Sequence, residues 1–326
     1  MTLVLSDEDV RESFDWGLAI KALHAAYAAA GTASRYPNRT VAKGGINWLR
    51  SLTGIPADGS PMGAKIIAGA WANRQVAYLI SLFDQDTAEL VALMDGNSVT
   101  GFRTAATSAL ATNLLARPGT ISVGVIGSGF EAQKHVRALA AVRRLEAVKV
   151  FSPRPQSRVR FASELADLNV PVSAAESARE AISEVDVVVC AARSYDETPT
   201  LLGEWLQPGQ TVISIGSTVA EQREVDTETI KRTDVIIADV LSEVLHETGD
   251  LLAAKADNID AEHKAFSLAD LAAGNVKGRQ DERQIILYKS VGAGLQDLAV
   301  ASMCAERAAA LGLGAPLPIR IQPVTK

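Results

Sequence analysis

Hydrophobic and polar residues follow a helical spacing at the start of the chain and a shorter spacing after it. Residues 6–31 have the apolar periodicity of one helix, with Ser6 as a candidate N-cap and Gly31 as a stop. After residue 40 the pattern changes to short apolar runs separated by turn residues, which is typical of antiparallel strands. These runs lie at 47–54, 62–71, 76–84 and 89–96, with a hairpin turn at 84–87. Residues 99–116 are again helical in pattern.

From Thr120 onward, apolar runs of strand length alternate with amphipathic helical segments. Strands are expected at 121–127, 147–152, 170–174, 185–192, 211–216 and 234–240, and helices at 130–142, 157–168 and 176–182. This alternation predicts a parallel sheet covered on both faces. A closed barrel would need eight such units, more than are present. Residues 284–314 form a strand-like run, a glycine turn and a long helix.

The composition fits a globular protein of two domains, because 326 residues with 48% hydrophobic content can bury a large core. A net charge of −6 argues against nucleic-acid binding. The start of the chain does not resemble a secretory signal, and no apolar run is long enough to span a membrane. We therefore expect a cytoplasmic protein, with Cys190 and Cys304 as reduced core thiols. The four histidines are scattered, so no metal is expected.

A glycine pattern follows the strand expected at 121–127. The sequence GSGFEA, from Gly127 to Ala132, has the form GxGxxA at a strand-to-helix turn. The first glycine permits the tight turn, the second lets a pyrophosphate approach the backbone, and the small third residue lets helix and strand pack closely. This position predicts a dinucleotide site, with the helix N-terminus facing the phosphates.

The loop after the next strand indicates which dinucleotide is bound. An NAD-binding unit has an acid here for the ribose 2′-hydroxyl, whereas an arginine accommodates the 2′-phosphate of NADP. Glu146 precedes the strand and so lies at its wrong end, while Ser152, Arg154 and Arg158 follow it. A solvated surface loop is the alternative. We expect NADP(H) rather than NAD(H).

Two cationic residues interrupt apolar elements. Lys65 lies in an apolar strand and Arg103 in a helix of small and apolar residues. A charge in such surroundings needs an anionic partner or an opening to a cleft. The alternatives are an edge lysine whose head reaches water, and a buried ion pair of Arg103 with a protein acid. Arg39 is by itself only a loop arginine.

Together these residues carry a family resemblance. The chain resembles the ornithine cyclodeaminase and mu-crystallin family over most of its length, most specifically in FRTAATSALAT (residues 102–112) and KSVGAGLQD (289–297). The resemblance implies an α/β fold: a Rossmann-type dinucleotide domain at 118–291, and an α+β substrate and dimerisation domain at 1–117 completed by 292–326. It also implies a homodimer.

The resemblance also implies residue roles. Arg39, Lys65 and Arg103 match the family residues that surround the substrate carboxylate, and Asp297 matches an acid close to the nicotinamide; a helix acid of the first turn is the alternative. Cofactor contacts are expected from the residues just discussed and their neighbours: Thr104, Gly127, Ser128, Gly129, Phe130, Glu131, Ala132, Ser152, Arg154, Arg158, Ala191, Gly216, Ser217, Ser290 and Gly292.

Two departures from the cyclodeaminase pattern disfavour ornithine as the substrate. Thr218 stands where the cyclodeaminases have an aspartate for the substrate amine and proton transfer, and Asp226 does not fill that position. Arg50 lies near where they have an acid for the basic substrate; a second substrate carboxylate is one possible partner for it.

The leading hypothesis is an NADPH-dependent reductase of small carboxylated imines, or an amino-acid dehydrogenase in reverse. Lys65, Asp297 and Thr218 are the candidate catalytic residues, and Arg39, Lys65, Arg103 and Arg50 the candidate substrate ligands. One alternative is a cyclodeaminating lyase that keeps NAD bound. The other is a non-catalytic protein that binds small ligands.

Overall fold

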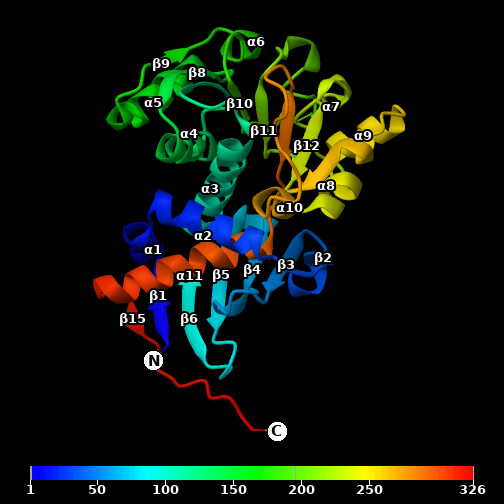
Figure 1. Cartoon of the computed structure of the whole chain (residues 1–326). Coiled ribbons are helices and arrows are strands. Elements are labelled where there is room, and N and C mark those ends of the chain that lie inside the picture. Colours follow the sequence, from blue (N-terminus) through cyan, green and yellow to red (C-terminus); the bar gives the residue numbers. More distant parts are fainter. Residues whose placement is uncertain (1, 195, 326) are drawn as a thin grey trace. The chain divides into compact units, whose positions relative to one another are not determined.

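The structure is a computed structural model that describes residues 2–194 and 196–325 (Figure 1). The chain divides into two compact units, Met1–Thr104 with Ala293–Lys326, and Ala105–Gly292. The first boundary falls inside one helix, α3 (Asn97–Leu115), and the second just before the C-terminal helix α11 (Gly294–Leu311). The sequence placed these boundaries at 117/118 and 291/292.

The first unit is built on a seven-stranded sheet of order β15-β1-β6-β5-β4-β3-β2. The pairs from β2 to β6 are antiparallel, as expected, whereas β1 is parallel to β6. The strands are β1 (Leu3–Leu5), β2 (Thr40–Gly44), β3 (Asn47–Gly54), β4 (Met62–Ala70), β5 (Gln75–Phe83), β6 (Leu90–Asp95) and β15 (Ala315–Pro316).

Helix α11 packs directly on this sheet (Figure 1). Gly54 and Gly63 face each other on β3 and β4, and a Cβ at either position would lie 3.0 Å from a Leu298 methyl group. The absence of side chains at these two positions therefore lets α11 approach the strands closely. Helix α2 packs against α11 in turn.

The single helix expected over residues 6–31 is wrong, because the chain forms α1 (Asp7–Ser13) and α2 (Trp16–Ala28) with a break between them. Phe14 is extended there, and its ring stacks on that of Phe102 with 3.8 Å between centroids. Asp15 restarts the helix by accepting a hydrogen bond from the Leu18 amide. The predicted N-cap Ser6 is confirmed, since it forms a capping box with Asp9.

The second unit is an eight-stranded sheet of order β13-β12-β14-β11-β10-β7-β8-β9 in which every pair is parallel. This confirms the parallel sheet. The strands are β7 (Ile121–Ile126), β8 (Leu145–Phe151), β9 (Val172–Ala174), β10 (Val187–Cys190), β11 (Thr211–Ser214), β12 (Val235–Ala238), β13 (Ala265–Ser267) and β14 (Ile286–Lys289). Strands β10, β11, β12 and β14 are buried along their whole length, as expected for a sheet with two covered faces.

Besides the end of α3, seven α-helices lie within the described residues of this unit: α4 (Phe130–Val142), α5 (Pro155–Glu164), α6 (Ala178–Ala181), α7 (Thr227–Arg232), α8 (Leu241–Glu247), α9 (Gly249–Ala256) and α10 (Leu268–Ala272). The chain builds the sheet outward from β7 in both directions, first to β8 and β9 and then back to β10. Parallel sheets of this kind bind ligands at the carboxyl ends of the strands where the order reverses. That point lies at β7 and β10.

Candidate active site

The register of the first sheet gathers cationic residues on one of its faces. Lys65 lies opposite Leu52, and Arg50 lies opposite Ile67. Because cross-strand partners share a face and alternate residues of a strand do too, Lys65 and Arg50 lie on the same face. Arg39 immediately precedes β2. Thr40 pairs with Ser51, so continuing the register by one residue puts Arg39 opposite Leu52, which is on the same face as Lys65.

Lys65 is the most deeply buried of these cations. Its side chain has no solvent exposure, and its Nζ donates a 2.9 Å hydrogen bond to Asp297 Oδ1. Burial lowers the pKa of Lys65 to about 8; Asp297 opposes the change, while Arg103 and Arg50 add to it. An ammonium with a pKa this close to neutrality can act as an acid.

Arg103 joins the same carboxylate. Its Nε lies 3.0 Å from Asp297 Oδ1, and its Nη1 donates a 2.6 Å hydrogen bond to Gln296 Oε1. Gln296 Nε2 donates to the Tyr27 hydroxyl, at 2.8 Å. The first turn of α11 therefore holds Lys65 and Arg103 side by side within the first unit. The structure thus shows the ion pair of Arg103 with a protein acid that the sequence left open.

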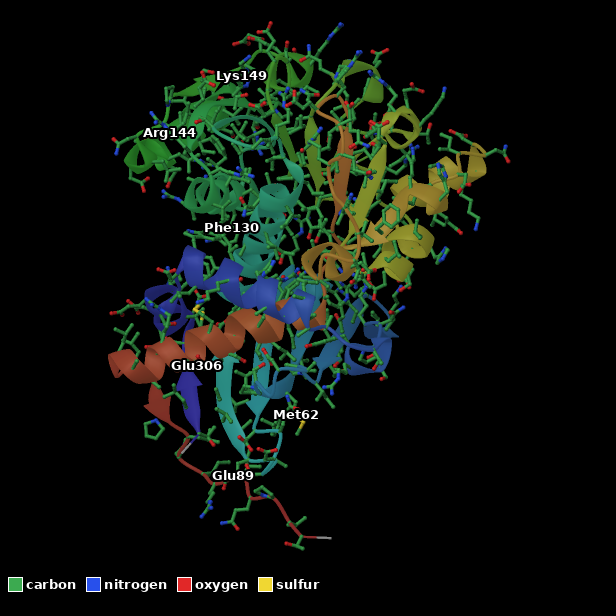
Figure 2. All side chains as sticks on the ribbon, in the orientation of Figure 1. Met62, Glu89, Phe130, Arg144, Lys149 and Glu306 are labelled. Atoms are coloured by element: carbon green, nitrogen blue, oxygen red, sulfur yellow. The ribbon has the colours of Figure 1, made fainter. Side chains whose placement is uncertain are left out.

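In the second unit, the glycine loop is built as the motif requires. Gly127 has φ +112°, and a Cβ there would lie 2.6 Å from the Ala191 carbonyl oxygen. Helix α4 starts at Phe130, labelled in Figure 2, with Gly129 as an N-cap that has no side-chain hydrogen bond. Ala132 is fully buried, which allows the helix to pack closely. These features fit a dinucleotide pyrophosphate.

The loop after β8 is held by Arg158. Its Nε donates to the Ser152 carbonyl at 2.7 Å, its Nη1 lies 3.2 Å from Glu176 Oε2, and its guanidinium covers the Phe151 ring at 5.0 Å. Arg154 is the exposed N-cap residue of α5. Glu146 is the second residue of β8, so the structure confirms that it lies at the opposite end of the strand.

Two further loops at the carboxyl ends of strands contain predicted cofactor residues. After β11, Ser217 Oγ donates to the Gln222 carbonyl at 2.9 Å, and the Thr218 amide donates to Gln222 Oε1 at 3.0 Å. After β14, Asp239 accepts hydrogen bonds from Ser290 Oγ, at 2.7 Å, and from the Gly292 amide, also at 2.7 Å.

Sequence reasoning missed Asp239 and Gln296, although both had a signal. Asp239 directly follows the buried strand β12, and ligands of parallel sheets bind at the carboxyl ends of the strands. Gln296 adjoins Asp297 in GLQD. It also missed a buried cluster around Glu224, described below.

Comparison with known proteins identifies the family. The model of the ornithine cyclodeaminase/mu-crystallin family matches residues 56–311, so the chain belongs to this family. It is 30% identical to an iminosuccinate reductase of Paracoccus denitrificans over 97% of this chain and 100% of that protein. It is 32% identical to the mouse ketimine reductase mu-crystallin, over 69% of this chain and 67% of the relative.

A solved structure agrees with the fold. The Δ1-pyrroline-2-carboxylate reductase of Thermococcus litoralis, solved in complex with NADH and L-proline, superposes with a TM-score of 0.88 at 28% identity, covering 97% of this chain and 100% of that one. The family resemblance and the Rossmann-type α/β fold expected from the sequence are thereby confirmed. Within the described residues, no helix is both long enough and apolar enough to cross a membrane.

Proposed function

We propose that this protein is a pyridine-nucleotide-dependent oxidoreductase that reduces small carboxylated imines to amines. Three findings support this function: the family, relatives named as imine and ketimine reductases, and the glycine loop of the second unit. The observation that carries the proposal is the buried Lys65 ammonium, held by Asp297 beside two arginines and with its pKa lowered to about 8.

The nicotinamide supplies a hydride to the imine carbon when it is bound. Lys65 gives the imine nitrogen a proton, so that the C=N bond becomes CH–NH. Asp297 is the group that orients the Lys65 ammonium, since it accepts the 2.9 Å hydrogen bond from Nζ. A positioned acid of this kind contributes about a hundredfold or more to the rate.

Arg39 and Arg103 bind the substrate carboxylate, and Arg50 binds a second one. The charges that shift the pKa of Lys65 are one acid, Asp297, and two arginines, Arg103 and Arg50. With Lys65 itself, these groups sum to a net charge of +2. This balance favours a substrate with two carboxylates, and iminosuccinate, named in one relative, is such a dianion.

Thr218 argues against the cyclodeaminating lyase. A lyase must hold a free amine and move protons at neutral pH, for which a threonine hydroxyl needs an adjacent base. One contact of the Thr218 hydroxyl is the Gln222 amide oxygen, 3.4 Å away, and an amide oxygen is not a base. The reductase needs less from this position because Lys65 supplies the proton.

NADPH is the preferred nucleotide in this proposal. The 2′-phosphate is bound by Ser152 and Arg154, in the loop that Arg158 holds in place. The remaining cofactor contacts are Thr104, Ser128, Gly129, Phe130, Glu131, Ala191, Gly216, Ser217, Ser290 and Gly292. NAD(H) is the second candidate, because NADH accompanies the Thermococcus litoralis relative.

The functional assembly is a homodimer formed through the first unit. On strands β3 and β5, Leu49 and Leu79 are 49% and 47% exposed, and their partners Ala68 and Ile66 on β4 place them on the same face of the sheet; Trp71 after β4 is 58% exposed. Neighbouring exposed apolar residues of this size are typical of interaction surfaces. Sedimentation of the purified protein as a monomer at assay concentration would contradict the dimer.

The activity is tested with the purified full chain and NADPH. The panel contains a cyclic imino acid, pyruvate with ammonia, oxaloacetate with ammonia, and ornithine. We expect NADPH consumption with the imines, most with the dicarboxylic one, and no ammonia release from ornithine. Conversion of ornithine to proline without added cofactor would restore the lyase, and ligand binding without either reaction would indicate the non-catalytic protein.

A further inference from the structure

A second group of buried charges lies in the nucleotide unit. Glu224, Asp250, Lys289 and Ser214 have no solvent exposure. Lys289 Nζ lies 2.8 Å from Asp250 Oδ2 and donates to Ser214 Oγ at 2.9 Å. Ser214 and Lys289 are the last residues of the paired strands β11 and β14. The cluster therefore lies at the carboxyl ends of the strands, where the ligand-binding loops of a parallel sheet begin.

Glu224 connects this cluster to two of those loops. Its Oε2 accepts from Ser214 Oγ at 2.6 Å and from the Gly216 amide at 2.8 Å. Its Oε1 accepts from the Ala192 amide at 3.2 Å. Ala192 belongs to the loop after β10 and Gly216 to the loop after β11, so one carboxylate ties both loops together.

The contact continues to the glycine loop. A Cβ at Gly216 would lie 2.4 Å from Glu224 Oε1, so only glycine lets the loop approach the carboxylate. On the other side, the Ala191 carbonyl meets Gly127 so closely that a Cβ there would lie 2.6 Å from its oxygen. Glu224 thus contacts Ala192 and Gly216 directly, and residues 191–192 lie in turn against Gly127 of the GxGxxA turn.

We propose that Glu224 is a positioning residue for nucleotide binding: its carboxylate holds the loops after β10 and β11 in the arrangement that receives the cofactor. This inference rests on the proposed function, because it assumes that the second unit binds a nicotinamide nucleotide. Glu224 itself does not touch the nucleotide, and it acts through Ala192 and Gly216.

The charge state of Glu224 matters for this role. Burial raises the pKa of Glu224 to about 7, against Lys289 and the hydrogen bonds from Ser214 and Gly216, while Asp250 adds to the rise. The ionisable groups facing it are Lys289 from β14, Asp250 from α9 and Cys190 from β10. An ionised carboxylate accepts all three hydrogen bonds. A protonated one must use an oxygen as donor, so its hold on the loops weakens as the pH falls through about 7.

Glu224→Gln separates positioning from stability. It keeps the shape but puts an NH₂ group against one of the donors, so one loop is released. Loss of a charge-assisted hydrogen bond weakens NADPH binding about tenfold. The melting temperature should change little, because the cost of the unsatisfied donor is offset when the cluster of one cation and two carboxylates becomes neutral. The difference in NADPH affinity between about pH 6 and about pH 8, which the raised pKa predicts for the natural protein, should shrink to the part caused by the 2′-phosphate of the ligand, which itself titrates at about pH 6.

Asp226→Asn is the matched control. Asp226 lies two residues away and caps α7 by accepting from the Thr229 amide at 2.8 Å, a role that asparagine also performs. We expect this variant to bind NADPH like the natural protein. If Glu224→Gln binds NADPH with natural affinity and pH dependence, or loses binding only in proportion to a lower melting temperature, the inference is wrong.

Hydrogen exchange of the natural protein tests the same point if the variant fails to fold. After correction for the intrinsic rates, the amides of Ala192 and Gly216 should be less protected at about pH 6 than at about pH 8, because the protonated carboxyl accepts fewer bonds. Equal protection would overturn the inference. A natural protein that binds neither NADPH nor NADH would refute the proposed function first, and the inference with it, so the two failures are distinguishable.

Discussion

Each unit buries a lysine against an aspartate, and the two pairs differ in what surrounds them. Lys65 lies 2.9 Å from Asp297 in the first unit, and Lys289 lies 2.8 Å from Asp250 in the second. All four side chains are fully buried. By distance and burial alone the two pairs cannot be told apart.

The surroundings separate them. The Lys65 pair lies near two arginines, Arg103 and Arg50, which lower the pKa of the lysine further. Around Lys289 a second carboxylate, Glu224, accepts from backbone amides and from Ser214. We therefore interpret the Lys289 cluster as one that fixes structure and, in line with the proposed function, the Lys65 cluster as one arranged for an anionic ligand.

The strongest test of this comparison replaces each lysine with methionine in a separate variant. Lys65→Met removes the proton donor, so we expect imine reduction to fall by about a hundredfold or more while NADPH binding and the melting temperature stay near their natural values. Lys289→Met leaves Asp250 and Glu224 without a cation, which costs about 3–5 kcal/mol of the free energy of unfolding. Steady-state kinetics and thermal melts check both. A Lys65→Met enzyme with near-normal turnover would reduce Lys65 to a structural residue like Lys289.

Arg50→Ala asks whether the excess positive charge selects the substrate. Removing one charge-assisted contact should lower kcat/KM for a dicarboxylic imine about tenfold or more, with a smaller change for a monocarboxylic imine. The ratio of the two kcat/KM values is the measurement. Equal losses on both substrates would show that Arg50 acts through the electrostatic potential of the site or through packing, and that it does not bind a second carboxylate.

Arg154→Ala extends the comparison to the nucleotide unit, where an exposed arginine is expected to bind an anion. Affinity for NADPH should fall about tenfold and that for NADH should hardly change, because only NADPH has a 2′-phosphate to lose. Titration of cofactor fluorescence measures both affinities. Arg160→Ala, on the same helix α5, is the control and should leave both unchanged. Equal weakening of the two nucleotides would refute the NADPH preference.

The smallest expected effect is the pH dependence of the Lys65 step. Lys65 donates as an ammonium, so the rate should fall as the pH rises through its pKa of about 8, well below the ordinary 10.5. Folding weakens proton binding at Lys65. The contribution of Lys65 to the free energy of unfolding therefore increases as the pH rises from about 8 to 10.5. The rate profile and melts across this range measure both. An alkaline limb that persists in Lys65→Met would assign the titration to another group.

Local patterns in the sequence determined much of this protein. The run of residues 130–142 matches α4, and the strand at 47–54 matches β3, because hydrophobic period and turn residues act over short distances. The GxGxxA turn, and the position of Glu146 at the start of its strand, could also be recognised from neighbouring residues alone. The break at Phe14 was not, since it depends on the ring of Phe102, far along the chain.

The tertiary structure alone decided the charge clusters. Asp297 meets Lys65 from 232 residues away, and Lys289 meets Ser214 from 75. The sequence marked Lys65 and Arg103 as cations that need an anion, and the family pattern marked Asp297, but neither showed that one carboxylate oxygen serves both. The hydrophobic pattern around Glu224 gave no indication of its role. Its partners depend on which strands lie side by side. Parallel strands can be far apart along the chain, and the hydrophobic periodicity does not predict which of them pair.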